Sequence, residues 1–329
     1  MCTAISFQTA DHYFGRNLDL EYHYHEEVVI TPRNRSVPFR FAQQSARHYA
    51  YIGMATVVDD YPLYYDATNE YGLSAAGLNF PDYAIYNAVI SGAQNIAPFE
   101  LIPWVLGQCR CLSEAKSLLQ KTNICSEAFS DQLHVTPLHW MISDPTGSIV
   151  VEPSEDGLKL YDNPINVLTN SPPFPYHRLR INDFMNITRE IPINHFADDL
   201  KLTPYSNGMG GIGLPGDISS SSRFIRAAFV LNNSVCGNSE TESISQFFHI
   251  LDTVSQTCGC ARVNGDFEIT YYASCCNTSK GIYYYKTYEN SQISAVYLQN
   301  EDLNGKLLVR YPLITTQQIK TINKEKPSV

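Results

Sequence analysis

The order in which strand-like and helix-like segments follow one another limits the folds open to this chain of 329 residues. Alternating patterns typical of strands fill much of the first part, helical periodicity follows, and strands return in the middle. Two more helical stretches precede a tail of aromatic-rich strands. Because strands and helices do not alternate, a parallel doubly wound sheet is not expected. We expect an α+β fold in which mixed sheets are stacked and covered by helices.

The individual segments follow from local patterns. Alternation and turn residues predict strands at 2–7, 13–20, 51–58, 72–79, 139–143, 148–152, 165–169, 268–273, 280–286 and 293–298. Helical spacing predicts helices at 98–106 with a kink at Pro103, at 113–119 with Ser113 as N-cap, and at 176–185, 221–230 and 241–251. The glycine-rich stretch 208–216 is expected to be a loop.

Composition excludes several classes of protein. Hydrophobic residues make up 44% and charged residues 17%, which is typical of a chain with a substantial core. The formal net charge of −10 and the lack of basic runs argue against a nucleic-acid partner. No apolar stretch approaches the ~20 residues of a membrane span. No signal-peptide pattern is seen at the N-terminus, so a cytoplasmic location and one domain over 1–329 are expected.

The nine cysteines call for an explanation of their own. Their odd number in a long chain disfavours a disulfide framework. Cys258-Gly259-Cys260 and Cys275-Cys276 could suggest a metal site, but neither spacing is typical of zinc ligands. We expect free thiols that pack as small apolar residues, and no bound metal.

Cys2 follows the initiator methionine directly. Removal of Met1 would leave one residue that carries both a thiol and a free α-amine. In model peptides these groups titrate near ~8.5 and ~8, so they can exchange a proton at neutral pH. A nucleophile activated by its own terminal amine is a known catalytic device.

The next predicted strand carries two charged residues, Arg16 and Asp19. If strands 2–7 and 13–20 pair as a hairpin, both residues return beside Cys2. The arginine would stabilise a thiolate and the aspartate would orient the amine. The alternative is an ordinary surface ion pair of little energetic value, and the charges alone favour that alternative.

Six motifs follow one another in a characteristic order, at residues 1–3, 14–19, 77–81, 167–172, 213–217 and 222–226. Together they resemble the choloylglycine hydrolase family, and most closely its bile salt hydrolases from Gram-positive gut bacteria. The aromatic segments 281–285 and 287–290 extend the resemblance almost to the end of the chain.

The resemblance implies an N-terminal-nucleophile (Ntn) hydrolase, with two antiparallel sheets sandwiched between helical layers. It implies hydrolysis of the amide that joins a bile acid to glycine or taurine, without cofactor or metal, by a homotetramer. The residues that match the family's catalytic positions are Cys2 as nucleophile, Arg16 and Asp19 beside it, Asn79 and Asn170 as oxyanion donors, and Arg223 as the remaining polar residue.

A bile salt needs an apolar, aromatic pocket with few polar groups. By resemblance, the pocket is built from loops around the nucleophile. The residues expected to line it are Leu18, Leu20, Tyr22, Leu63, Tyr64, Tyr65, Ala67, Phe129 and Leu133.

Each assignment has an alternative. Asn79 and Asn170 precede prolines closely and could be turn residues, and Arg223 could pair with Asp217. Penicillin V acylase shares the chemistry, although that branch often has tyrosine at the position of Asn79. A non-enzymatic steroid-binding protein is a third reading, which the presence of Cys2 disfavours.

Overall fold

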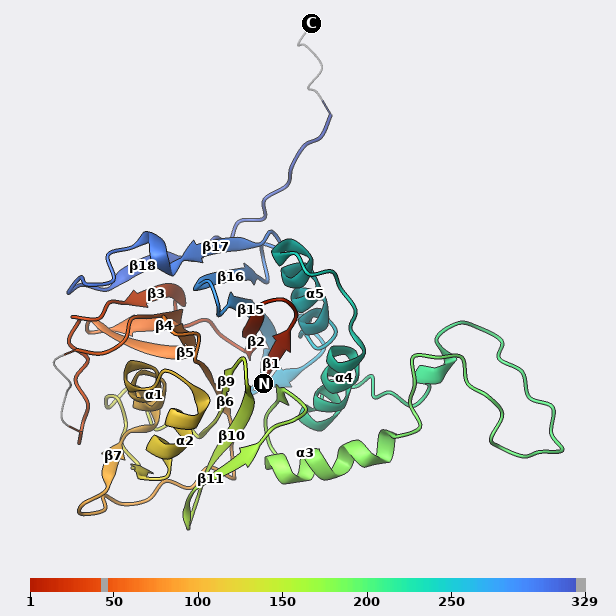
Figure 1. Cartoon of the computed structure of the whole chain (residues 1–329), viewed down its shortest axis with the longest axis horizontal. Coiled ribbons are helices and arrows are strands. Elements are labelled where there is room, and N and C mark those ends of the chain that lie inside the picture. Colours follow the sequence, from red (N-terminus) through yellow and green to blue (C-terminus); the bar gives the residue numbers. More distant parts are fainter. Residues whose placement is uncertain (43–46, 324–329) are drawn as a thin grey trace, which may run out of the picture.

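Two antiparallel sheets stacked face to face form the centre of the molecule (Figure 1). The computed structural model describes residues 1–42 and 47–323. The first sheet has the strand order β12-β1-β2-β15-β16-β17. Its strands are β1 (Cys2–Gln8), β2 (His12–Leu20), β12 (Val167–Leu168), β15 (Ile269–Asn277), β16 (Ile282–Thr287) and β17 (Ser294–Tyr297).

The second sheet has the order β11-β10-β9-β6-β5-β4-β3-β18. Its strands are β3 (Glu27–Thr31), β4 (Tyr51–Val58), β5 (Tyr61–Asn69), β6 (Ser74–Asn79), β9 (Leu138–Asp144), β10 (Gly147–Ser154), β11 (Gly157–Asp162) and β18 (Val309–Pro312). Two small ribbons lie outside these sheets, formed by the pairs β7 (Gln94–Ile96) with β8 (Thr122–Ile124), and β13 (Arg262–Val263) with β14 (Asp266–Phe267).

Helices cover the outer faces of both sheets, as Figure 1 shows. α1 (Leu101–Gln108) and α2 (Leu112–Leu119) pack on the second sheet. α4 (Ser220–Asn233) and α5 (Glu240–Asp252) pack on the first, and α3 (Phe174–Arg180) lies against α4. Short 3-10 turns occur at η1 (Pro98–Glu100), η2 (Ile181–Phe184), η3 (Met209–Gly211) and η4 (Leu298–Asn300). The layers therefore run helix, sheet, sheet, helix.

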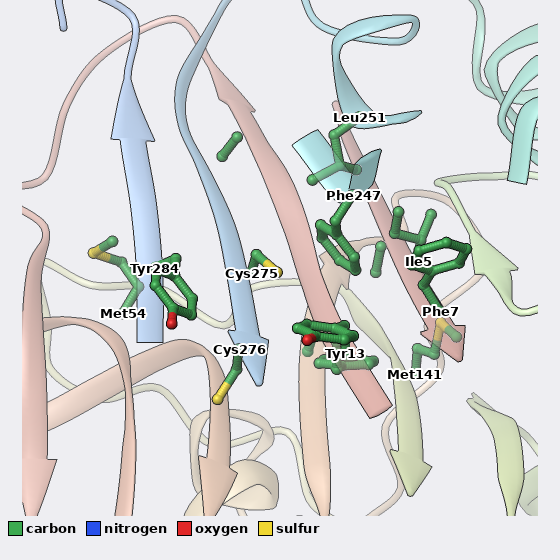
Figure 2. Close-up of a cluster of buried hydrophobic side chains, with 14 of the residues drawn as sticks. Ile5, Phe7, Tyr13, Met54, Met141, Phe247, Leu251, Cys275, Cys276 and Tyr284 are labelled. Atoms are coloured by element: carbon green, nitrogen blue, oxygen red, sulfur yellow. The ribbon is translucent and has the colours of Figure 1, made fainter. Parts of the chain in front are cut away.

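The buried side chains form two clusters that match these layers. The larger fills the space between the sheets and under α4 and α5, and the smaller lies between the second sheet and α1 and α2. Figure 2 shows members of the larger cluster, among them Ile5 of β1, Met54 of β4, Phe247 of α5 and Tyr284 of β16. Cys2 belongs to this larger cluster.

Helices α1 and α2 begin in a different way from the sequence prediction, and α3, α4 and α5 begin one or two residues before the predicted positions. Pro103 lies in the first turn of α1, where its missing N–H is not needed, so α1 is not interrupted there. The change of geometry comes earlier, where η1 passes into α1. α2 begins at Leu112 rather than after an N-cap Ser113, and its first N–H donates to the Asp144 carboxylate at 2.7 Å.

The strand predictions differ mainly by omission. The strand expected at 165–169 is only two residues long, and β3, β5, β11 and β18 were not predicted. In β5 a bulge opposite Met54 and Ala55 leaves Tyr65 without a partner, which breaks the alternation that marks a strand. β3 is buried at every position, so it shows no alternation at all.

Candidate active site

Strands β1 and β2 pair as the hairpin that the sequence analysis gave as a condition, and this hairpin brings the N-terminus, Arg16 and Asp19 together. Cys2 pairs with Leu18, and the Asp19 N–H donates to the Met1 carbonyl at 2.9 Å. On its other edge β1 pairs with β12, where Ala4 lies opposite Leu168. Two residues further along the antiparallel ladder, Asn170 reaches the level of Cys2.

Alternation along the strands divides the site into two faces. Cys2, Leu18 and Arg16 face the second sheet, because Arg16 Nη1 donates to the Tyr65 carbonyl at 3.1 Å. Thr3 and Asp19 face the helices: Thr3 Oγ1 accepts from Arg223 of α4 at 2.6 Å. The nucleophile candidate therefore points between the sheets, while its backbone is held from the helix side.

Arg16 is fully buried and binds backbone carbonyls, including that of Gly77 in β6. Burial alone would lower its pKa, but nearby acidic groups, with Cys2 first and then Tyr272 and Asp66, outweigh burial and raise the pKa. In the described part of the chain Arg16 makes no ion pair with Asp19, so the alternative of a surface pair is wrong. A fixed cation beside a thiol favours the thiolate.

Asp19 is also fully buried, and it lies beside the N-terminal residue in space. Its carbonyl accepts from the Met1 ammonium at 2.8 Å, and its Oδ1 accepts from the Thr270 hydroxyl at 2.6 Å. Burial raises the pKa of Asp19, and Arg223 acts against that rise. The ammonium is therefore held by the Asp19 backbone carbonyl, and the nearby Asp19 carboxyl acts on it by charge, in the direction that raises the pKa of the ammonium.

Asn170 is held by three partners in a single orientation. Its Oδ1 accepts from the Cys2 N–H at 2.6 Å and from Arg223 Nη2 at 2.8 Å. Its Nδ2 donates to the Asn79 carbonyl at 2.7 Å, which joins β6 to the site. Because Oδ1 is occupied by donors, the amide nitrogen is the end of Asn170 that is turned toward Asn79, and it has a second proton to donate. The alternative that Asn170 is only a turn residue is therefore wrong.

Arg223 lies in the first turns of α4 and is fully buried. It donates to the Cys2 carbonyl and to Thr3 Oγ1, each at 2.6 Å, in addition to Asn170. Asp217 instead accepts from Ser222 at 2.6 Å, so the predicted alternative of an Arg223–Asp217 pair is not observed. Burial lowers the pKa of Arg223, and Asp19 acts against that change.

The predicted pocket residues fall into separate groups. Leu18 is part of the cluster that contains Cys2, and Leu20 and Tyr65 pack against that cluster. Tyr64 and Ala67 lie instead in the cluster under α1 and α2. The bulge at Tyr65 is the reason, because it puts Tyr64 and Ala67 on the face of β5 opposite to the site. Tyr64 and Ala67 therefore do not face the site, contrary to the prediction.

The other four pocket residues lie toward the surface. Tyr22 is 51% exposed on the loop after β2. Leu63 and Leu133 are partly buried, and Phe129 packs edge-on to Phe99. Their part in a pocket stays a prediction.

The sequence analysis did not identify two residues in or just before β15 that contact the N-terminal region. Thr270 lies opposite Asp19, and Glu268 just before the strand forms an ion pair with the Met1 ammonium. Thr3 was also missed as a partner of Arg223. No motif marks these residues, since their position depends on pairing between distant strands.

The cysteines show no arrangement for a metal. All nine are free thiols; Cys258 and Cys260 are exposed, whereas Cys275 and Cys276 are buried within β15. Within residues 1–42 and 47–323, no group of three or more His, Cys, Asp or Glu side chains could hold a metal ion. No helix in the same ranges is long and apolar enough to cross a membrane.

Once Met1 is removed, the arrangement gives a buried thiol, a terminal amine on the same residue, a cation beside the thiol and an amide donor fixed nearby. These are the groups that acyl transfer through a covalent intermediate requires. A family model described as linear amide C–N hydrolases, choloylglycine hydrolase family, matches residues 2–311.

Individual relatives agree with the family model. The chain is 49% identical to a bile salt hydrolase/transferase of Lactiplantibacillus plantarum, over 98% of this chain and 100% of the relative. It is 40% identical, over the same shares, to a bile salt hydrolase/transferase of Clostridium perfringens.

Solved structures also match. The C2A mutant of the conjugated bile acid hydrolase from Clostridium perfringens superposes with a TM-score of 0.91 at 38% identity, covering 98% of this chain and 100% of that one. Penicillin V acylase from Agrobacterium tumefaciens shares the fold with a TM-score of 0.73 at 19% identity, over 94% of this chain and 90% of that one. The chain belongs to the choloylglycine hydrolase family and has the expected Ntn-hydrolase fold.

Proposed function

We propose that this protein hydrolyses the amide bond of glycine- and taurine-conjugated bile salts. The observation that carries the proposal is the buried Cys2 at the chain start, enclosed by Arg16, Asn170 and Arg223. The relatives named as bile salt hydrolases are similar over nearly the whole chain, which supports the same substrate class.

In the proposed mechanism the Cys2 thiol gives its proton to the terminal amine, and the thiolate attacks the amide carbonyl. Arg16 stabilises the thiolate, and Asp19 orients the resulting ammonium. The ammonium returns the proton to the departing nitrogen, so glycine or taurine leaves as the amine. Water then hydrolyses the thioester and releases the bile acid, with no metal or cofactor.

The tetrahedral intermediate needs donors that are fixed before it forms. We propose the Asn170 amide, through its second proton, and the Asn79 backbone N–H. Arg223 occupies the carbonyl side of Cys2 and the oxygen of Asn170, so its part is to hold both in place.

Rates on glycocholate, taurocholate and penicillin V test the substrate class. We expect release of glycine and taurine to exceed hydrolysis of penicillin V, and faster turnover of penicillin V would favour the acylase alternative. Cys2→Ala should abolish hydrolysis while the protein stays folded, and Cys2→Ser should retain little activity because a hydroxyl is far less acidic than a thiol. Near-normal activity of Cys2→Ala would contradict the mechanism.

Both relatives are named as transferases as well as hydrolases. A thioester can be attacked by an amine as well as by water, so we propose that amino acids act as acyl acceptors. Incubation of a bile salt with excess free amino acid, followed by mass spectrometry for new conjugates, tests this second activity. Absence of new conjugates while hydrolysis proceeds would contradict it.

We also propose the homotetramer that the resemblance implies. Residues 185–217 form an arm that projects from the body beyond α3 (Figure 1). Large apolar side chains on the arm are exposed, among them Ile193 at 73%, Phe196 at 82% and Tyr205 at 84%. An exposed apolar surface of this kind is typical of an interface, and a second copy of this chain is the partner we propose.

The chain is further proposed to form one domain and to reside in the cytoplasm. Both sheets supply residues to the site, which supports a single folding unit. Nine free thiols suit a reducing compartment. Cell fractionation tests the location.

A further inference from the structure

Glu268 is a buried carboxylate that the mechanism above does not use. Only 1% of it is exposed, and it lies just before β15, where its N–H donates to the Ala261 carbonyl at 3.0 Å. Its carboxylate forms an ion pair with the Met1 ammonium.

Within residues 1–42 and 47–323, that ion pair is the one interaction of this carboxylate. Among the residues that the structure describes, neither oxygen of Glu268 has a hydrogen-bond partner. A buried carboxylate is strongly disfavoured unless a cation or several donors accompany it. Asp19 is in a related position, because its Oδ2 has no hydrogen-bond partner in the described part of the chain, while Oδ1 accepts from Thr270. Two carboxylates with unused oxygens therefore converge on the chain terminus.

The cation moves by one residue when Met1 is removed. The bonds that join the Met1 and Cys2 nitrogens are about 1.46, 1.52 and 1.33 Å long, so the two nitrogens are less than about 4 Å apart. The Cys2 ammonium is then within the reach of Glu268, directly or through one water molecule. The other groups that act on the terminus are Cys2 itself, Asp19, Glu21 and Arg223.

We propose that Glu268 is a positioning residue of the catalytic N-terminus, and that its carboxylate, with that of Asp19, holds the Cys2 ammonium. The negative charges stabilise the state in which the S–H bond has broken and the N–H bond has formed. They also offset Arg223, whose charge opposes a protonated amine. The inference rests on the proposed mechanism and assigns Glu268 a part in it.

The amine can be titrated without any substrate. In a Cys2→Ala background the processed chain keeps its α-amine and has no competing thiol at that residue. The fraction acetylated by acetic anhydride over a pH series, measured on the N-terminal peptide by mass spectrometry, gives the amine pKa. Glu268→Gln should lower this pKa by about half a pH unit or more, because a nearby negative charge is removed. Glu289→Gln, the same change at an exposed position on the segment after β16, should leave the pKa unchanged.

Kinetics with Cys2 present give the second readout. The alkaline limb of kcat/KM for glycocholate should move to lower pH in Glu268→Gln, whereas a purely structural defect would lower the rate equally at all pH values. If Glu268→Gln does not fold, Glu268→Asp keeps the charge but withdraws it by about 1.5 Å, and a smaller decrease of the amine pKa is expected. An unchanged amine pKa in a folded Glu268 variant overturns the proposal. Since the titration needs no turnover, this result is distinguishable from failure of the proposed function.

Discussion

At the residue scale, the site depends on buried groups that hold the backbone of Cys2 from both sides. Asn170 and Arg223 bind each other and bind Cys2 at its nitrogen and its carbonyl, respectively. The motifs around these two residues were recognisable in the sequence. Glu268 and Thr270 were not, because Thr270 contacts Asp19 across 251 residues of chain and no local pattern encodes that contact.

Asn170→Ala tests the role of the hydrogen bonds that hold the Cys2 backbone. The change removes the acceptor for Cys2 and Arg223 as well as the proposed oxyanion donor, and loss of one such donor typically costs ~10²–10³ in kcat. We expect a decrease of that size in glycocholate hydrolysis with a small change in KM. Asn182→Ala, at an exposed position in η2, is the control and should be as active as the wild type. A kcat within a few-fold of the wild type would remove Asn170 from the mechanism.

At the element scale, the position of the site follows from how β2 fits between β1 and β15. The alternation at 2–7 and 13–20 predicted two strands, and these strands pair as a hairpin. Tyr64 and Ala67 were expected in the pocket by resemblance alone, and the bulge in β5 places them on the face opposite to the site. A pattern of period two specifies which face a side chain occupies only while the strand is regular.

Gly15 shows how closely β2 and β15 approach. A Cβ atom at Gly15 would lie 2.1 Å from the Ser274 carbonyl oxygen, so a backbone must move. We expect Gly15→Ala to lower the free energy of unfolding by about 1–3 kcal/mol or more, seen as a lower thermal midpoint. At Gly216 an added Cβ would have no atom within 4 Å apart from its own residue and chain neighbours, so Gly216→Ala should leave the thermal midpoint unchanged. Equal midpoints for the two variants would contradict this packing.

At the scale of the whole molecule, a buried histidine connects the two sheets. His12 of β2 hydrogen-bonds with Ser6 of β1 and Thr278, each at 2.8 Å, and with Ser143 of β9 at 3.2 Å. Burial lowers its pKa from 6.5 to about 4. The position of such a residue in a core is not predictable from a pattern of polar and apolar residues.

The lowered pKa of His12 makes the stability of the folded chain depend on pH. Between about pH 4 and 6.5 the unfolded chain binds a proton at His12 that the folded chain does not, so stability falls as the pH decreases through this window. The loss attributable to His12 at pH 5 is roughly 2 kcal/mol, from ~1.4 kcal/mol per pH unit. His12→Gln should therefore lose less thermal stability than the wild type between pH 7 and pH 5. His134→Gln, at an exposed site outside the arm, should behave as the wild type, and an equal loss in all three proteins would contradict the assignment.

The arm at 185–217 is tested at the level of the assembly. Light scattering of the wild type should give four times the chain mass of 37.0 kDa. Ile193→Glu with Phe196→Glu should lower that mass, because two exposed apolar contacts become charged. Thr203→Glu with Ser206→Glu adds the same charge to the arm without removing an apolar side chain, and should remain assembled. A wild-type monomer, or an unchanged mass in the first variant, would refute the proposed interface.

The central claim concerns the terminal amine of Cys2, and the same chain can be prepared with and without it. Expression with and without an inhibitor of methionine aminopeptidase gives retained and processed forms, which intact-mass measurement identifies. Released glycine from glycocholate is then quantified for each form. We expect turnover only from molecules that begin at Cys2, in proportion to their fraction; equal rates from molecules that retain Met1 would contradict the mechanism.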